Sequence, residues 1–142
     1  MPVYVQVHAA VAVDGKLVVY RRRGHEVATL PGGRVKQREL VTAALVRETQ
    51  EEIGIPIEVG PLLLAAEVLD AARETVVLVF AATPRSAGEV RCLELVDPAS
   101  EEAYEVLPPV LGQLVRYARG VHEGGGARWM GNLYHPFDSL TA

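Results

Sequence analysis

The chain has 142 residues, of which 49% are hydrophobic and 23% charged, and its formal net charge is −4. This length predicts one domain with one substantial core, and the negative charge argues against general binding to nucleic-acid backbones. The single cysteine, Cys92, excludes a disulfide framework within the chain, which favours a reducing, cytoplasmic location.

Two strands joined by a tight turn are predicted at the start of the chain. Val3 to Val13 is rich in β-branched residues and partly alternates, which is typical of a strand. Asp14-Gly15 is the strongest hairpin-turn signal, and residues 16–20, which contain the apolar run LVVY, predict a return strand buried on both faces. This start carries no basic region typical of a signal peptide, and no apolar run reaches the roughly 18 residues of a membrane span.

Three arginines, at positions 21–23, follow the second strand. They either lie at a solvated strand end or bring a planar guanidinium to a substrate phosphate. For the second use the candidates are Arg22 and Arg23. Both interpretations stay open from the sequence.

A helix is predicted from about Arg38 to Ile53, after the glycine pair Gly32-Gly33. Gly54 is typical of a left-handed helix end, with a proline shortly after it. The packing surface is predicted to consist of small and aliphatic residues, namely Leu40, Val41, Ala43, Ala44 and Leu45.

Three carboxylates, Glu48, Glu51 and Glu52, occupy positions i, i+3 and i+4 of this helix. They therefore lie on one side within a single turn, where like charges repel by roughly 0.2–0.5 kcal/mol per pair. Such a cluster is tolerable if water screens it or if a cation lies between the carboxylates. Mg²⁺ prefers carboxylate oxygens together with water and substrate phosphates.

The remainder of the chain predicts three strands, a second helix and a tail. The strands are 57–68, with a kink at Gly60-Pro61, then 75–83, which is the most strand-like run and is expected to be central, and 89–96. A helix is predicted over 108–119. Beyond the hinge of glycines 124–126, Trp129 and Tyr134 belong to an aromatic tail expected to dock on its own domain or on a second subunit, or to stack on a base.

The segment from Gly33 to Ile55 resembles the Nudix box, the signature of the Nudix hydrolases. That signature has a Gly, a Glu, then Arg-Glu, a Glu pair, a Gly and an aliphatic residue at fixed spacings. Here those positions are held by Gly33, Glu39, Arg47, Glu48, Glu51, Glu52, Gly54 and Ile55. Thr49 stands where an aliphatic residue is usual; since threonine keeps a branched methyl group, we expect a small packing change. Arg38 stands where a Gly is common, and Ala28 where an aromatic is common.

The resemblance implies an α/β class, with an α/β/α sandwich around a mixed sheet in residues 1–120 and the tail in 121–142. It implies Mg²⁺, or Mn²⁺ in its place, as the cofactor. Its ligands are expected to be Glu48 and Glu52, then Glu51 and the carbonyl group of Gly32. Arg47 is expected to hold Glu48, with Glu39 supporting Arg47 or a water at the metal, and Arg34 joins Arg22 and Arg23 as a substrate-binding candidate.

The implied reaction is hydrolysis of a pyrophosphate bond in a nucleoside diphosphate linked to another group. The general base is left open among Glu51, Glu89, Glu101 and Glu102. Residues 70–73, Asp-Ala-Ala-Arg, contain neither the Pro of the ADP-ribose branch nor the Tyr of a dinucleoside polyphosphate branch. A non-catalytic nucleotide-binding or regulatory module is the alternative, and a homodimer is possible because dimers are common in the family.

Overall fold

A mixed β-sheet centred on two parallel strands organises the chain in the computed structural model. The structure describes residues 2–21, 23–24, 26–69, 71–86, 93–108, 111–119 and 128–132. Strand β1 (Val3–Val13) pairs in parallel with β5 (Glu74–Pro84) and antiparallel with β2 (Lys16–Val19) and β3 (Gly32–Arg34). The central position expected for residues 75–83 is confirmed, because β5 lies between β1 and β4 (Ile57–Leu69).

The full strand order is β6-β2-β1-β5-β4-β7, where β6 is Glu94–Val96, with β3 added beside β1. Strand β4 runs antiparallel to β5, and β7 (Arg128–Asn132) runs parallel to β4 at the edge of the sheet. The pairing of β4 with β5 shifts register between Val59 and Leu64. This confirms the kink predicted at Gly60-Pro61, where proline cannot donate to the ladder and glycine permits a bulge.

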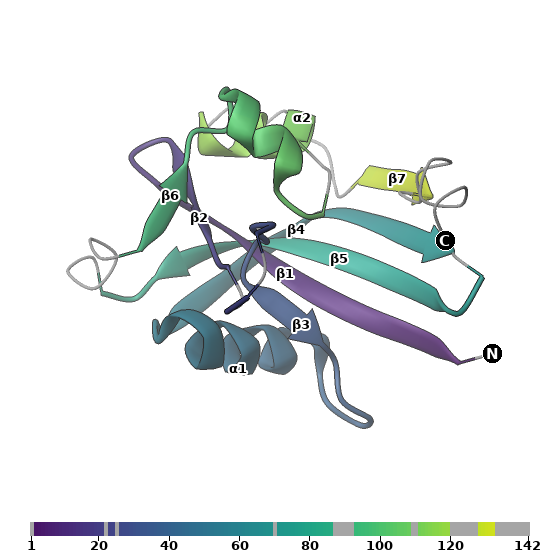
Figure 1. Ribbon diagram of the computed structural model, residues 1–142. Helices are drawn as coiled ribbons and strands as arrows, with labels where there is room; N and C mark the ends of the chain where they lie inside the picture. Colours follow the sequence, from purple (N-terminus) through teal and green to yellow (C-terminus); the bar gives the residue numbers. More distant parts are fainter. Residues whose placement is uncertain are drawn as a thin grey trace.

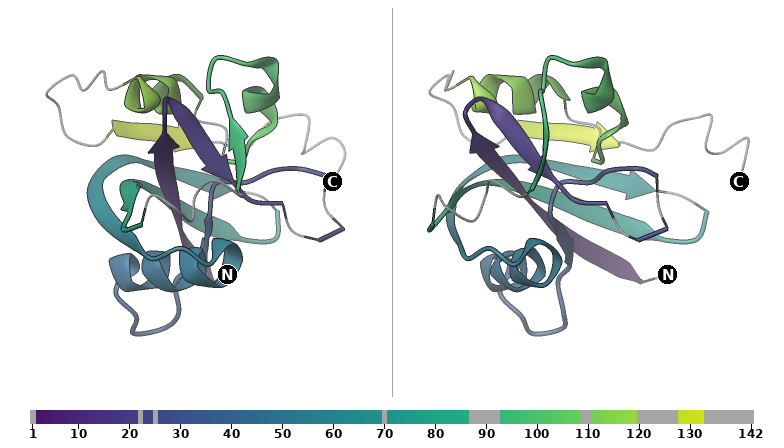
Figure 2. Two further views of the ribbon diagram at one scale, coloured as in Figure 1. Left: turned by 90° about the vertical axis from the view of Figure 1, so that its left-hand side faces the viewer. Right: turned by 60° about the vertical axis from the view of Figure 1, so that its left-hand side comes forward.

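Helices cover both faces of the sheet. Figure 1 shows α1 (Val41–Ile53) on one face, and α2 (Leu111–Ala118) with the short helix η2 (Glu101–Glu105) on the other; the turned views of Figure 2 agree. Val18 of β2 belongs to the apolar core beneath α1, whereas Leu17 and Val19 belong to the core on the opposite face. Burial of β2 on both faces is therefore confirmed, as is the α/β/α sandwich.

Helix α1 begins at Val41, three residues later than the sequence predicts. Arg38 has a φ of 62°, a left-handed conformation that cannot continue a right-handed helix. Leu40 is the N-cap residue and is 75% exposed, and Ala43 is exposed as well, so the packing role predicted for these two residues is wrong. Ala44 and Leu45 are buried as predicted, and Gly54, with a φ of 68°, ends the helix in the predicted way.

The C-terminal part of the chain is described in shorter pieces. Strand β6 (Glu94–Val96) lies within the predicted strand 89–96, whose first four residues are outside the described part. Helix α2 covers most of the predicted 108–119, and β7 adds to the sheet beside β4. Of the tail's aromatic residues, Trp129 is 60% exposed, while Tyr134 lies outside the described residues. None of the described helices combines the length and apolarity needed to cross a membrane.

Candidate active site

Two carboxylates of α1 face the glycine pair of β3. Oε1 of Glu52 accepts a hydrogen bond of 3.2 Å from the backbone N–H of Gly32. The carboxyl group of Glu48 lies against Gly33, because a β-carbon on that glycine would be 2.5 Å from the Glu48 carboxyl carbon. Since residues four apart share a helix face, the two carboxyl groups converge on the same short backbone segment.

The glycine pair permits this close approach between helix and sheet. Gly32 lies opposite His8, and Gly33 opposite Val7, in the antiparallel pairing of β3 with β1. Gly32 has a φ of 155°, and a β-carbon there would overlap the carbonyl oxygen of Val7. A side chain at either position would push the strand away from β1 or from α1.

Arg47 connects the carboxylates of the site. Its Nε and Nη2 atoms donate to the two oxygens of Glu39 at 2.9 and 3.0 Å, a planar two-bond arrangement. Its Nη1 atom donates to Glu48 at 2.9 Å and lies 3.5 Å from Glu51, while Nη2 also donates to the carbonyl oxygen of Arg34. The structure thus brings Arg47, Glu39, Glu48 and Glu51 together as the sequence predicts.

Glu39 is held in its ionised form by this arrangement. Its side-chain hydrogen bonds with Arg47, followed by one from the backbone N–H of Lys36, lower the pKa of Glu39 to about 2. The same hydrogen bonds with Glu39 raise the pKa of Arg47 above its ordinary value. Arg47 therefore carries a permanent positive charge that offsets the repulsion among its neighbouring carboxylates.

Glu51 differs from Glu48 in exposure. The side chain of Glu51 is 59% exposed, whereas that of Glu48 is 19% exposed. Because its contact with Arg47 is long and open to solvent, Glu51 is the carboxylate with most freedom to reorient toward a ligand or a water.

These residues fit a hard divalent cation. No three His, Cys, Asp or Glu side chains within the described part of the chain are grouped closely enough to hold a metal by themselves. The two carboxylates that converge on this backbone segment supply oxygen donors, which Mg²⁺ takes together with waters and substrate phosphates. The Glu48 carboxyl group lies where a β-carbon at Gly33 would be, so glycine at this position lets the carboxylate reach the segment.

Two polar residues of β1, to which the sequence assigned no role, lie beside this segment. Gln6 and His8 alternate along the strand and so lie on one face. His8 is buried, and burial lowers its pKa, partly opposed by its hydrogen bond with the carbonyl oxygen of Leu30. Two polar residues spaced by two in an otherwise apolar strand could have indicated a polar site on one face of β1. The sequence did not indicate which strand pairs with β1 at these positions.

The arginines predicted to bind substrate differ in their surroundings. The guanidinium carbon of Arg34 lies 3.9 Å from the centre of the Tyr4 ring, next to the glycine pair. Arg21 is engaged by Glu94, at 2.8 Å from Nε, and by the carbonyl oxygen of Glu26. Arg23 is exposed in a turn, and Arg22 lies outside the described residues.

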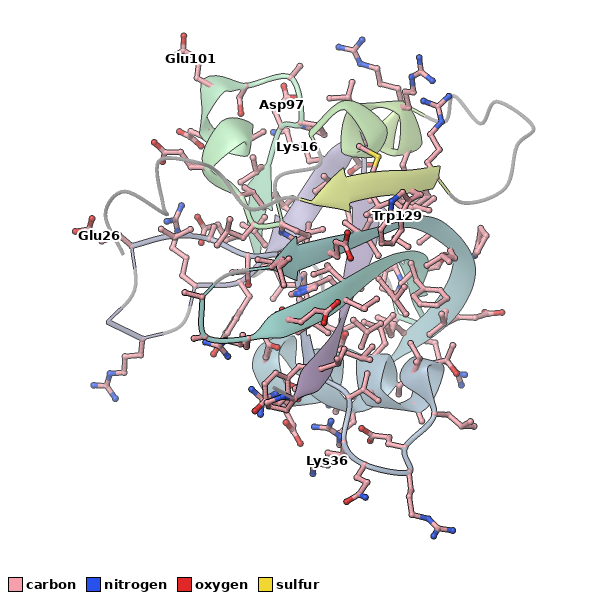
Figure 3. The ribbon with its side chains drawn as sticks, turned by 90° about the vertical axis from the view of Figure 1, so that its right-hand side faces the viewer. Lys16, Glu26, Lys36, Asp97, Glu101 and Trp129 are labelled. Atoms are coloured by element: carbon pink, nitrogen blue, oxygen red, sulfur yellow. The ribbon has the colours of Figure 1, made fainter. Side chains whose placement is uncertain are left out.

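Other candidates from the sequence lie away from the box helix. Figure 3 places Glu101 at one end of the molecule and Lys36, whose backbone contacts Glu39, at the other. Glu102 lies on η2 with Glu101, and both residues are exposed, while Glu89 is outside the described residues. Figure 3 also places Trp129 on the β7 side, apart from Lys36. Among the described candidates for a general base, only Glu51 contacts Arg47.

Comparisons with known proteins agree with this geometry. Residues 4–112 match the sequence model of the NUDIX domain. A MutT NUDIX hydrolase from Burkholderia pseudomallei is 27% identical, with 87% of this chain and 100% of that chain covered and a TM-score of 0.58. The E. coli ORF135 protein is 24% identical over 88% of this chain and 96% of that one, with a TM-score of 0.66.

A UDP-X diphosphatase has a similar structure, with 19% identity, 91% of this chain and 68% of that chain covered, and a TM-score of 0.69. Because the E. coli protein and the UDP-X diphosphatase are less than 25% identical to this chain, their similarity shows a shared fold only. No curated protein sequence matches the chain. The domain match extends over more than half of the residues and includes the glycine pair and the whole of α1. The chain therefore belongs to the Nudix family and is a Nudix hydrolase.

Proposed function

We propose that this chain hydrolyses a pyrophosphate bond in a nucleoside diphosphate linked to another group, and that the reaction depends on Mg²⁺. The observation that carries the proposal is the convergence of Glu48 and Glu52 on the Gly32-Gly33 segment. Two carboxylates with a nearby carbonyl group are suited to Mg²⁺ and poorly suited to softer metals. When bound, the ion supplies positive charge that offsets the charge of the diphosphate and promotes attack by water.

The residues of the site have distinct roles in this proposal. Glu48, Glu52 and the carbonyl group of Gly32 are the ligands, with Glu51 as a further ligand or as the general base. Arg47 keeps the Glu48 carboxylate in one orientation, and Glu39 keeps Arg47 in place through its two hydrogen bonds. The role of general base is assigned by exposure to solvent. A base must reach water, and Glu51 has the most exposed side chain among the carboxylates that contact Arg47.

Arg34 is the substrate-binding residue that the geometry favours. It follows Gly33 directly, and its stacking on Tyr4 fixes the guanidinium plane while leaving the N–H groups at its edge able to meet an anion. Solved relatives support a nucleotide substrate in general terms, because one is described as a UDP-X diphosphatase and another, 14% identical, as an ADP-ribose pyrophosphatase.

A substrate panel tests the proposal. Phosphate or nucleotide release should be measured with nucleoside triphosphates, nucleotide sugars and ADP-ribose, each with Mg²⁺ and with EDTA. We expect turnover of at least one class, inhibition by EDTA and recovery on addition of Mg²⁺ or Mn²⁺. Undiminished turnover in EDTA would contradict the metal dependence, and no turnover of any class would contradict the substrate assignment.

A further inference from the structure

His8 lies directly behind the glycine segment of the site. It faces Gly32 across the pairing of β1 with β3, and only 8% of its surface is exposed. A histidine buried among apolar neighbours loses hydration, so both ring nitrogens need partners. Its hydrogen bonds therefore indicate what the ring does at this place.

The Nδ1 atom of His8 holds the chain just before Gly32. It lies 3.1 Å from the carbonyl oxygen of Leu30, and because a carbonyl group only accepts, Nδ1 carries the proton. Pro31 has no N–H group to donate, and its carbonyl oxygen accepts from the backbone of Ala9 at 2.8 Å. The stretch from Leu30 to Pro31 is thus fastened to β1 by one side chain and one backbone bond.

The same ring also limits where Gly32 can lie. A β-carbon on Gly32 would be 2.9 Å from Nδ1 of His8, so the ring packs closely against the glycine. The Nε2 atom lies 3.3 Å from the end of the Gln6 side chain. With the proton on Nδ1, Nε2 accepts, so the Gln6 amide is turned with its N–H group toward the ring. On the other side of the glycine, the Gly32 N–H donates to Glu52. A continuous set of contacts therefore runs from Gln6 through His8 and Gly32 to the Glu52 carboxylate.

We propose that His8 is a positioning residue for the divalent cation, holding the Gly32 peptide in the orientation that Glu52 and the cation require. The inference rests on the proposed function, because it assigns the Gly32 carbonyl group to the metal. The donor at Nδ1 is the essential feature. A partner of this kind behind a metal ligand contributes roughly 10- to 100-fold to metal affinity.

Two substitutions separate the hydrogen bond from the volume of the ring. His8→Leu removes the donor, whereas His8→Asn places an amide N–H where Nδ1 stands. Mn²⁺ affinity should be measured by isothermal titration calorimetry, and the amide signal of Gly32 by NMR of the metal-free protein. We expect His8→Leu to weaken Mn²⁺ binding about 10-fold and to move the Gly32 signal, and His8→Asn to stay within a few-fold of the parent protein in affinity.

Thr75→Val is the matched control, because Thr75 is another buried polar residue, on β5 and away from the glycine segment. It should leave the Mn²⁺ affinity unchanged. If His8→Leu does not fold, His8→Gln replaces it, since glutamine mimics Nε2 and leaves the Leu30 carbonyl group without its donor; weakened binding is again expected.

The results distinguish this inference from the proposed function. A parent protein that binds Mn²⁺, with His8→Leu binding within twofold of it, overturns the role of His8 alone. Equal loss in His8→Asn and His8→Leu overturns it as well, because the hydrogen bond is then not the cause. A parent protein that binds no Mn²⁺ overturns the proposed function, and the role of His8 with it.

Discussion

The carboxyl group of Glu48 occupies the space that a side chain at Gly33 would fill. A β-carbon on Gly33 would lie 2.5 to 2.8 Å from the three heavy atoms of that carboxyl group. The glycine of β3 and the glutamate of α1 are therefore complementary, and the conformation of one limits the residue type of the other.

Gly33→Ala is expected to displace Glu48 and to reduce turnover on the order of 10- to 100-fold, with a smaller loss of stability. The measurement is kcat/KM on whichever substrate class the panel identifies, together with thermal unfolding. Gly54→Ala, at the C-cap of α1, is the control. Gly54 has a φ of 68°, and a β-carbon there would have no atom within 4 Å. The substitution should therefore destabilise the fold by about 1 kcal/mol through backbone strain and leave turnover intact. Equal turnover losses in both variants would contradict the specific contact.

Glu52→Gln is expected to abolish most turnover while the fold survives. Glutamine keeps the volume and an oxygen that accepts from the Gly32 N–H, but it loses the charge that a divalent cation requires, so a loss on the order of 100-fold follows. Turnover and circular dichroism spectra would be compared with those of the parent protein. Glu101→Gln, at an exposed position of η2, should retain turnover. Full activity of Glu52→Gln would exclude this residue as a metal ligand.

Glu39 should titrate near pH 2 because of Arg47. Its pKa is lowered to about 2 from 4.5, so its contribution to stability is complete above about pH 4.5 and is lost as the pH falls from there toward 2. Arg47→Lys removes the two parallel hydrogen bonds and should move the Glu39 midpoint toward 4.5, as measured by carbon NMR of the carboxyl group. A midpoint close to 4.5 in the parent protein would show that the ion pair does not form in solution.

Thr49→Val is expected to stabilise the protein. Thr49 is completely buried, and its hydroxyl oxygen has no hydrogen-bond partner among the described residues. An unpaired buried hydroxyl costs about 1–3 kcal/mol, and valine has nearly the same shape without it. Denaturant unfolding should show a gain of about 1 kcal/mol.

Thr42→Val on the exposed side of α1 is the control for this substitution. It exchanges the same two residue types in the same helix, so it has the same effect on helix propensity but no buried hydroxyl to remove. A change within roughly ±0.5 kcal/mol is expected. A loss of stability in Thr49→Val would mean that the hydroxyl group has a partner in solution. The sequence had suggested only that the threonine methyl group substitutes for an aliphatic residue.

The sequence determined the local arrangement of the site. Residues spaced by four on one helix share a face whatever surrounds them, because the pitch of the helix is constant; Glu48 and Glu52 could therefore be paired without a structure. The same reasoning gave the end of α1 at Gly54 and the central strand β5. Each of these depends on periodicity or on the backbone preference of one residue.

The tertiary structure decided which distant residues meet the helix. His8 and Leu30 are 22 positions apart, and their contact depends on the register of β3 against β1. Strand β3 consists of two glycines and an arginine. It therefore has no alternation of apolar and polar residues from which its register could be predicted. The left-handed Arg38 and the later start of α1 were likewise seen only in the structure, where Glu39, the next residue, accepts from Arg47. Local geometry is repeated along a chain and can be deduced from spacing, whereas strand register results from packing across the whole sheet.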